Sequence, residues 1–318
     1  MRPPGKFPEI ALWALLLSAS AIGADIRVGI VGTDSSHAPA FTQILNDASS
    51  PSHVPGARVV AAYKGGSRDL PKSYERVDGY AEELRTKWGV EIVPDIGTLC
   101  SKVDAVIIGS IDGRAHLAEV REVVAARKPM YIDKPLAATL DDARAIARIA
   151  AEAGVPWFTS SSLRFSPLAR ASKFPDARGY MVWGPGPLEE HHPMELAWYG
   201  IHSAELLFTL MGPGCEEVTR TFTNGADITT CRWKDGRIGT MRVNRPYSEF
   251  GVVTFREKEV ERSAPNPEPG YPGLMRAVVG FFQTGKPPVT PEETLEIFAF
   301  MDAAQRSKDA GGAPQKLR

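Results

Sequence analysis

The sequence is poor in cysteine. Three are present among 318 residues, Cys100, Cys215 and Cys231. An odd number excludes a framework in which every cysteine is paired. Since no C-x-x-C motif is present, a zinc site made of thiolates is not expected either. We expect three buried thiols, with a Cys215–Cys231 bond as the alternative if the strands that carry these residues are neighbours.

The sequence also lacks an excess of charge of either sign. Lys and Arg together number 37 against 38 for Asp and Glu, which leaves a net charge of -1. Proteins that bind nucleic acid or an acidic membrane surface usually carry a basic excess. The balance therefore argues against both kinds of partner and leaves small molecules and other copies of the chain.

No apolar run near the N-terminus has the usual length of a membrane span. Ile10–Ala19 is short for one, follows the basic residues Arg2 and Lys6, and precedes small residues. This is the pattern of a secretory signal peptide cleaved near Ala21 or Ala24; an uncleaved anchor is the alternative. Because no twin arginine is present, we expect export before folding, to the periplasm or the medium, where a nicotinamide cofactor is hard to collect.

The stretch Ile26–Ala40 predicts a buried strand, a glycine turn and the first turn of a helix. A dinucleotide-binding sheet places its pyrophosphate at this point. The glycine fingerprint that begins at Gly32 is incomplete, because Asp34 and His37 stand where its second and third glycines belong. We expect the Asp34 carboxylate to repel a phosphate there, unless Asp34 or the two serines after it cap the helix.

The second predicted strand, Ala57–Tyr63, lacks the acidic residue that usually follows it in NAD enzymes and binds the ribose hydroxyls. Lys64, Ser67 and Arg68 follow instead. A small basic loop suits a 2′-phosphate, so NADP is favoured over NAD. A solvated basic loop without a ligand is the alternative.

Strand and helix patterns alternate through the first half of the chain, which predicts an α/β fold with a doubly wound parallel sheet of the Rossmann type. From residue 177 the pattern changes to strands of an open, mostly antiparallel sheet, with a hairpin at Asp235-Gly236. The expected organisation is a signal peptide at 1–24, a nucleotide-binding domain at 25–135 and an α+β domain for substrate binding and oligomerisation at 136–318, whose C-terminal helix can pack back on the first domain.

The order and spacing of five motifs resemble those of the glucose-fructose oxidoreductase and inositol dehydrogenase family, known as Gfo/Idh/MocA. The motifs are GIVGTDSSH at 29–37, DAVIIGSIDGRAH at 104–116, YIDKPLA at 131–137, SSLRFSP at 161–167 and YGIHSAELLFTLMG at 199–212. The resemblance implies an NAD(P)-dependent oxidoreductase that acts on a sugar or polyol and forms homo-oligomers through the free face of its open sheet.

The resemblance also implies the site. Lys134 matches the family lysine near the nicotinamide, and His202 matches the family histidine, so these two handle the hydroxyl proton. A structural salt bridge is the alternative role for Lys134. Arg164 can bind a carboxylate or sugar hydroxyls, or form an ion pair between strands. The expected cofactor-binding residues are Gly32, Thr33, Ser35, Ser36, Lys64, Arg68, Ser110 and His116, the last with helix capping as its alternative.

The chain departs from the family pattern before His202. Trp198 stands where the family has an aspartate, so Glu205 is left to orient the histidine. The surrounding segment, residues 188–205, is rich in His and Glu and has metal binding as an alternative, although its spacing matches no established motif. These departures keep a second function open: a carbohydrate-binding protein, or a lyase or hydrolase, that uses the same cleft without redox chemistry.

Overall fold

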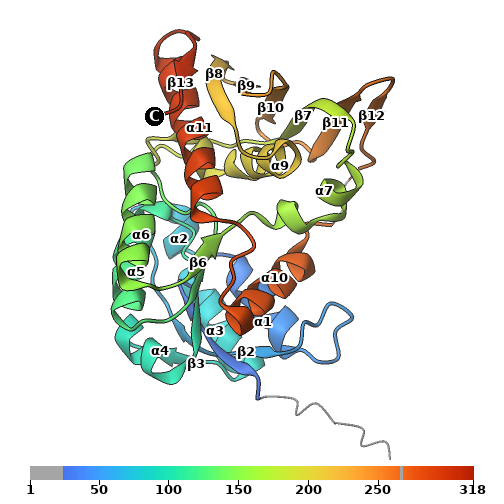
Figure 1. Ribbon diagram of the computed structural model, residues 1–318. Coiled ribbons are helices and arrows are strands. Elements are labelled where there is room, and N and C mark those ends of the chain that lie inside the picture. Colours follow the sequence, from blue (N-terminus) through green and yellow to red (C-terminus); the bar gives the residue numbers. More distant parts are fainter. Residues whose placement is uncertain (1–23, 266–267) are drawn as a thin grey trace, which may run out of the picture.

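The computed structural model describes residues 24–265 and 268–318 (Figure 1). Two sheets lie at opposite ends of the molecule, and the long helix α11 (Pro291–Asp309) belongs to the end that carries the second sheet. No helix in the described ranges is both long and apolar enough to cross a membrane. The predicted signal peptide lies almost entirely outside the described residues.

The first sheet is parallel, with six strands in the order β3-β2-β1-β4-β5-β6. Its central strands are short apolar runs buried on both faces, as parallel strands covered by helices must be; all four residues of β4 are buried. The prediction of a doubly wound parallel sheet is confirmed. The strands are β1 (Ile26–Val31), β2 (Ala57–Tyr63), β3 (Glu91–Val93), β4 (Ala105–Ile108), β5 (Met130–Ile132) and β6 (Trp157–Thr159).

Helices connect these strands, and their ends follow from local sequence. Asp95, Asp112 and Thr139 each accept a hydrogen bond from a backbone N–H in the first turn of their helix, as favoured N-cap residues do. Gly154 ends one helix in the left-handed conformation. The helices are α1 (His37–Asn46), α2 (Pro71–Tyr74), α3 (Val77–Trp88), α4 (Ile96–Lys102), α5 (Gly113–Ala125) and α6 (Leu140–Ala153).

One face of the first sheet is completed by a helix from near the end of the chain. The apolar side of α10 (Tyr271–Thr284) is in the same buried cluster as Phe41 of α1 and Val28 and Ile30 of β1. Figure 1 shows α10 beside α1, although more than 200 residues separate them in the sequence. The sheet itself also continues past residue 135, where the sequence placed the domain boundary, because β6, which follows α6, pairs with β5.

The second sheet has seven strands in the order β12-β11-β7-β10-β9-β8-β13 and is antiparallel except for the pair β10–β7. Its strands alternate buried and exposed residues, as expected when only one face is covered, and α9 (Ile201–Met211) and α11 pack against it. Asp235 and Gly236 lie in the turn between β9 and β10, as predicted. The strands are β7 (Ala177–Pro185), β8 (Cys215–Phe222), β9 (Ala226–Trp233), β10 (Ile238–Asn244), β11 (Gly251–Arg256), β12 (Val260–Arg262) and β13 (Gln315–Lys316).

The expectation of three buried thiols is wrong. Cys215 and Cys231 form a disulfide, with their Cα atoms 6.0 Å apart, because β8 and β9 are antiparallel neighbours. Cys100 is the buried free thiol. The sequence offered this pair as the alternative, and the strand order decides in its favour. Of the remaining short helices, η1 (Ser162–Phe165) and α7 (Pro167–Ala171) lie between β6 and β7 in the sequence, and α8 (Glu195–Trp198) lies between β7 and α9.

Candidate active site

A cavity of about 470 Å³ lies where the carboxyl edge of the first sheet meets the second domain. Ligand sites in open α/β sheets occur at this edge, because the loops after neighbouring strands meet there. The loops after β1, β4 and β5 contribute His37, Ile111 and Lys134, and the second domain contributes Trp198, Tyr199 and His202. Of the three catalytic candidates that we expect to meet in one pocket, Lys134 and His202 line this cavity and Arg164 does not.

Lys134 follows the buried strand β5, and only 9% of its surface is exposed. Among the described residues its Nζ has no hydrogen-bond or ion-pair partner, so the lysine is not held in the structural salt bridge that the sequence left open. Burial lowers the pKa of Lys134, although the neighbouring Asp133 charge opposes the shift. A lowered pKa favours the neutral amine, which is the form that can accept a proton.

His202 lies in the first turn of α9 and is buried against Tyr199 and Phe250. Its Nδ1 is 2.7 Å from the hydroxyl of Ser161, which fixes the plane of the ring. Burial lowers the pKa of His202 well below its usual value, and the positive charge of Lys134 adds to the shift. His202 is therefore neutral at neutral pH and can exchange a proton through its other ring nitrogen.

A second histidine, which the sequence analysis did not assign to the site, faces the same cavity. His37 Nδ1 lies 2.5 Å from a carboxylate oxygen of Asp133, and Asp133 also accepts a hydrogen bond of 3.1 Å from Tyr131. Burial would raise the pKa of Asp133, but the charge and hydrogen bond of His37 hold it well below its usual range. The signal in the sequence was present: Asp133 directly follows β5, His37 begins the helix after β1, and these two strands flank β4 in the sheet.

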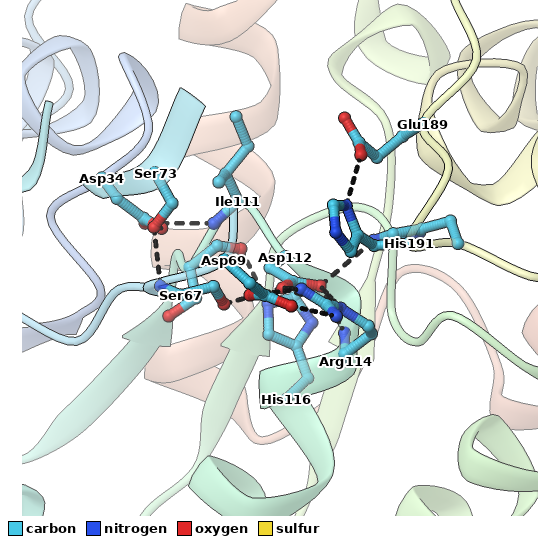
Figure 2. A network of polar contacts seen from close by, with 12 residues as sticks. Asp34, Ser67, Asp69, Ser73, Ile111, Asp112, Arg114, His116, Glu189 and His191 are labelled. Carbon is cyan, nitrogen blue, oxygen red and sulfur yellow. Dashed lines mark hydrogen bonds and ion pairs between the residues drawn. The ribbon is translucent and has the colours of Figure 1, made fainter. Parts of the chain in front are cut away.

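A network of polar contacts lies at the edge of the sheet beside this cavity (Figure 2). Asp112, at the start of α5, accepts hydrogen bonds from Ser67 at 2.7 Å and from Arg114 at 2.6 Å. A ring nitrogen of His192 from the second domain lies 3.1 Å from Asp112, and Arg114 also binds Asp69. These contacts tie the segment after β2 to the segment after β4 and to the second domain.

Asp34 does not face a phosphate position, which corrects the expected repulsion. It is fully buried, and its carboxylate accepts hydrogen bonds from the Ser73 hydroxyl at 2.6 Å and the Ile111 N–H at 3.1 Å (Figure 2). Burial raises the pKa of Asp34, and these two bonds oppose the rise. The side chain of Asp34 therefore links the segment after β1 to α2 and to the loop after β4. At the start of α1, the hydroxyl of Ser35 accepts the hydrogen bond from the His37 N–H.

A model of the family described as "Oxidoreductase family, NAD-binding Rossmann fold" matches residues 26–160. Over these residues the chain resembles the Gfo/Idh/MocA oxidoreductase family. The matched range ends one residue after β6, in agreement with the extent of the first sheet. The chain is also 34% identical over 86 residues to a Salmonella typhimurium protein, YceM, named as an oxidoreductase; this match spans 27% of the chain and 28% of that protein.

Solved structures of several dehydrogenases share the fold of nearly the whole chain. A scyllo-inositol dehydrogenase of Lactobacillus casei aligns with a TM-score of 0.74 at 15% identity, over 92% of this chain and 98% of that one. The myo-inositol dehydrogenase of the same organism, solved with NAD(H) and myo-inositol, aligns with a TM-score of 0.71 at 17% identity, over 92% and 97%. At such identities the likeness establishes the fold.

The matched family model is described as NAD-binding, and the place where a dinucleotide would lie is the glycine turn after β1. Gly32 has a φ of 88°, and any side chain there would collide with Ser110, so the turn keeps the shape that normally receives a pyrophosphate. Gly65, however, lies directly on this turn: a Cβ on Gly65 would be 3.2 Å from the Gly32 Cα. Segment 64–76 also lies across the loops after β1 and β4, because Ser73 donates to Asp34 and Ser67 donates to Asp112.

The other predicted cofactor residues surround this turn. The Thr33 hydroxyl donates to the Val77 carbonyl, Lys64 pairs with Asp78, and the Ser110 hydroxyl donates to Glu119. Both ring nitrogens of His116 contact backbone carbonyls in the interior. The helix-capping alternative for His116 is wrong, because Asp112 caps α5. Ser35 and Ser36 line the Lys134 cavity. Arg68 lines a separate hollow of about 430 Å³ beyond the end of β2.

Arg164 does not line the cavity. Its guanidinium lies 2.8 Å from Glu205 and 2.7 Å from Glu293, so the arginine is an internal ion-pair partner between η1, α9 and α11. Glu205 is occupied by this pair and does not contact His202, which Ser161 orients instead. The other His and acidic residues of segment 188–205 are likewise spread over separate partners, and within the described ranges no three His, Cys, Asp or Glu residues gather as metal ligands.

Proposed function

We propose that the protein is a Gfo/Idh/MocA oxidoreductase that oxidises a hydroxyl of a sugar or polyol, or reduces the corresponding ketone. The observation that carries this proposal is the pairing of two buried proton-handling groups, Lys134 and His202, in one cavity at the carboxyl edge of the sheet. A bound nicotinamide would supply the hydride acceptor. The relatives solved with myo-inositol or L-tartaric acid support a substrate with several hydroxyl groups.

The residues of this chain then divide the proton work. Lys134, whose pKa burial lowers, accepts the hydroxyl proton at Nζ or returns it. His202, held by Ser161, offers its free ring nitrogen to a neighbouring hydroxyl and fixes the orientation of the substrate. The aromatic walls Trp198 and Tyr199 reduce the access of water to the reacting carbon.

We infer weak dinucleotide binding with a preference for NADP over NAD. Support comes from the absence of an acidic residue after β2 and from the position of Arg68 in the hollow beyond that strand. We also infer export. The basic and apolar start of the chain supports it, as does the Cys215–Cys231 disulfide, since such bonds persist mainly in oxidising compartments.

We infer homo-oligomerisation through the outer face of the second sheet. Strands β7, β9, β10 and β11 present exposed apolar side chains on this face, and an apolar sheet face of this kind is typical of an interface. The residues are Met181, Ile228, Ile238 and Phe255. Sedimentation of the wild type against a variant with aspartate at Ile228 and Ile238 tests this proposal; a monomeric wild type would disprove it.

The function itself is tested with the mature protein and both oxidised cofactors. We expect reduced NADP to form in the presence of inositol or sugars, and the rate to fall below detection in Lys134→Ala while the protein stays folded. Mass spectrometry of protein released from the producing cells should find a retained nicotinamide nucleotide. If neither cofactor is bound or reduced, the redox proposal is refuted.

The contacts of segment 64–76 favour a second candidate function. This segment is bonded across the loops after β1 and β4, so Lys134, His202 and His37 can serve acid–base chemistry without a cofactor, as in a lyase. This candidate predicts loss or rearrangement of a polyol or sugar substrate, detected by mass spectrometry, in the complete absence of nicotinamide.

A further inference from the structure

The charges that line the Lys134 cavity are of one sign. Lys72, Arg76 and Lys134 are among its wall residues, together with the ring nitrogens of His37 and His202, and no Asp or Glu belongs to the described wall. Unbalanced charge of one sign in a partly enclosed cleft attracts a ligand of the opposite sign, because field lines concentrate there.

The nearest carboxylate does not neutralise this charge. Asp133 is buried behind the wall, where His37 and Tyr131 already occupy its oxygens. Lys72 and Arg76 form no ion pair with any residue in the described ranges, although the surface of this protein is otherwise rich in such pairs. Their positive charges are therefore available to a ligand.

The position of these cations gives the cavity two ends. Lys72 is held over the ring of the buried Trp198, 5.4 Å from its centre, and Arg76 lies at the start of α3. Both come from segment 64–76, the same segment that is bonded across the loops after β1 and β4. Lys134 and His202 come from β5 and α9. The wall therefore carries a cationic rim on one element and a buried acid–base pair on others.

We propose that the cavity binds a sugar acid: a hydroxylated carbon chain or ring that carries one anionic group, which lies between Lys72 and Arg76 while a hydroxyl-bearing carbon lies at Lys134 and His202. This inference rests on the proposed function for the role of Lys134 and His202, and it adds the class of substrate. An arginine and a lysine bind a carboxylate or a phosphate by the same charge-assisted hydrogen bonds. The choice between these two anions is made by the probes.

The test is calorimetric titration of the full mature chain without cofactor. D-Gluconate and D-sorbitol share a six-carbon chain and differ in one end, a carboxylate against a hydroxymethyl group, and D-glucose 6-phosphate supplies the phosphate arm. We expect at least one of the two anions to bind at least tenfold more tightly than sorbitol, with an affinity that falls as salt is added. Equal affinities for the anions and sorbitol would overturn the proposal.

Variants locate the anion. Arg76→Gln and Lys72→Gln should each weaken binding of the preferred anion about tenfold, the usual worth of one charge-assisted contact, and leave sorbitol binding unchanged. Lys87→Gln is the matched control, since it removes a lysine from the far end of α3 that is exposed and paired with Glu83. If the two variants weaken NADP binding but not anion binding, these cations serve the cofactor and the proposal is wrong.

Failure of this proposal and failure of the proposed function are distinguishable. Anion binding that depends on Arg76, without any reduction of NADP, supports the substrate class and refutes the redox reaction. Turnover of neutral polyols, together with an anion affinity that is unchanged in Arg76→Gln, supports the redox reaction and refutes the substrate class. The binding measurement needs no turnover, so an inactive preparation still gives a result.

Discussion

Replacement of Asp34 by glycine should have two opposite effects. The Asp34 carboxylate accepts two buried hydrogen bonds, from Ser73 and Ile111. A hydrogen bond to a charged group is worth about 1.5 kcal/mol at the low end of its range, so Asp34→Gly should lower the free energy of unfolding by about 3 kcal/mol. The variant also restores the second glycine of the fingerprint and releases segment 64–76. Binding of NADP should therefore become at least tenfold tighter, which corresponds to about 1.4 kcal/mol of relief.

Urea denaturation followed by circular dichroism measures the first effect, and calorimetric titration with NADP measures the second. Asp34→Asn is the matched control, because its carbonyl can accept from Ile111 while its amide donates to the Ser73 hydroxyl; it should remain within about 1 kcal/mol of the wild type. An unchanged stability in Asp34→Gly would refute the linking role of Asp34. Lost stability without a gain in affinity would show that segment 64–76 does not control access to the turn.

Further variants test the remaining assignments. Lys134→Ala should abolish turnover, or ligand binding in the non-redox case, and leave the urea transition in place; a variant that loses stability but keeps activity would return Lys134 to a structural role. Arg164→Met should cost about 3–5 kcal/mol in urea denaturation, because the buried Glu205 and the half-buried Glu293 lose their partner, and ligand affinity in the folded fraction should persist. Reduction of the Cys215–Cys231 bond, or its replacement by two serines, should cost about 3 kcal/mol, the value for a loop of this size. Because burial lowers the pKa of His202, below pH ~6.5 the imidazole is protonated in the unfolded chain and stays neutral in the native state. The free energy of unfolding should therefore fall with decreasing pH by up to about 1.4 kcal/mol per unit. In His202→Gln this dependence on pH should be weaker.

The first sheet could be predicted because its pattern is local. Apolar runs such as Ala105–Ile108 alternate with helices that carry their own caps, and the resulting strand order follows from connections that are short in sequence. The disulfide could not be decided in the same way. Cys215 and Cys231 are joined because β8 and β9 are neighbours, and no single stretch of sequence contains that pairing.

The site was predicted in part for the same reason. Lys134 and His202 occupy motif positions and could be named, whereas the direction of a side chain at a motif position could not. Asp34 stands at a glycine position, but its side chain is buried and bonded to Ser73. Arg164 forms ion pairs with Glu205 of α9 and Glu293 of α11. Lys72 belongs to no motif at all and reaches the cavity from the short helix α2.

The contribution of α10 to the first sheet bears on the order in which the chain can fold. Val28, Ile30 and Phe41 are buried against residues of α10, which begins at Tyr271. A ribosome must therefore release most of the polypeptide before the N-terminal half can bury this face. A fragment that stops at residue 160, although it includes every residue of the family match, would expose the face to water and to chaperones. A chain that completes this face late stays unfolded for longer during synthesis. Translocation before folding, which we infer for this protein, requires an unfolded chain.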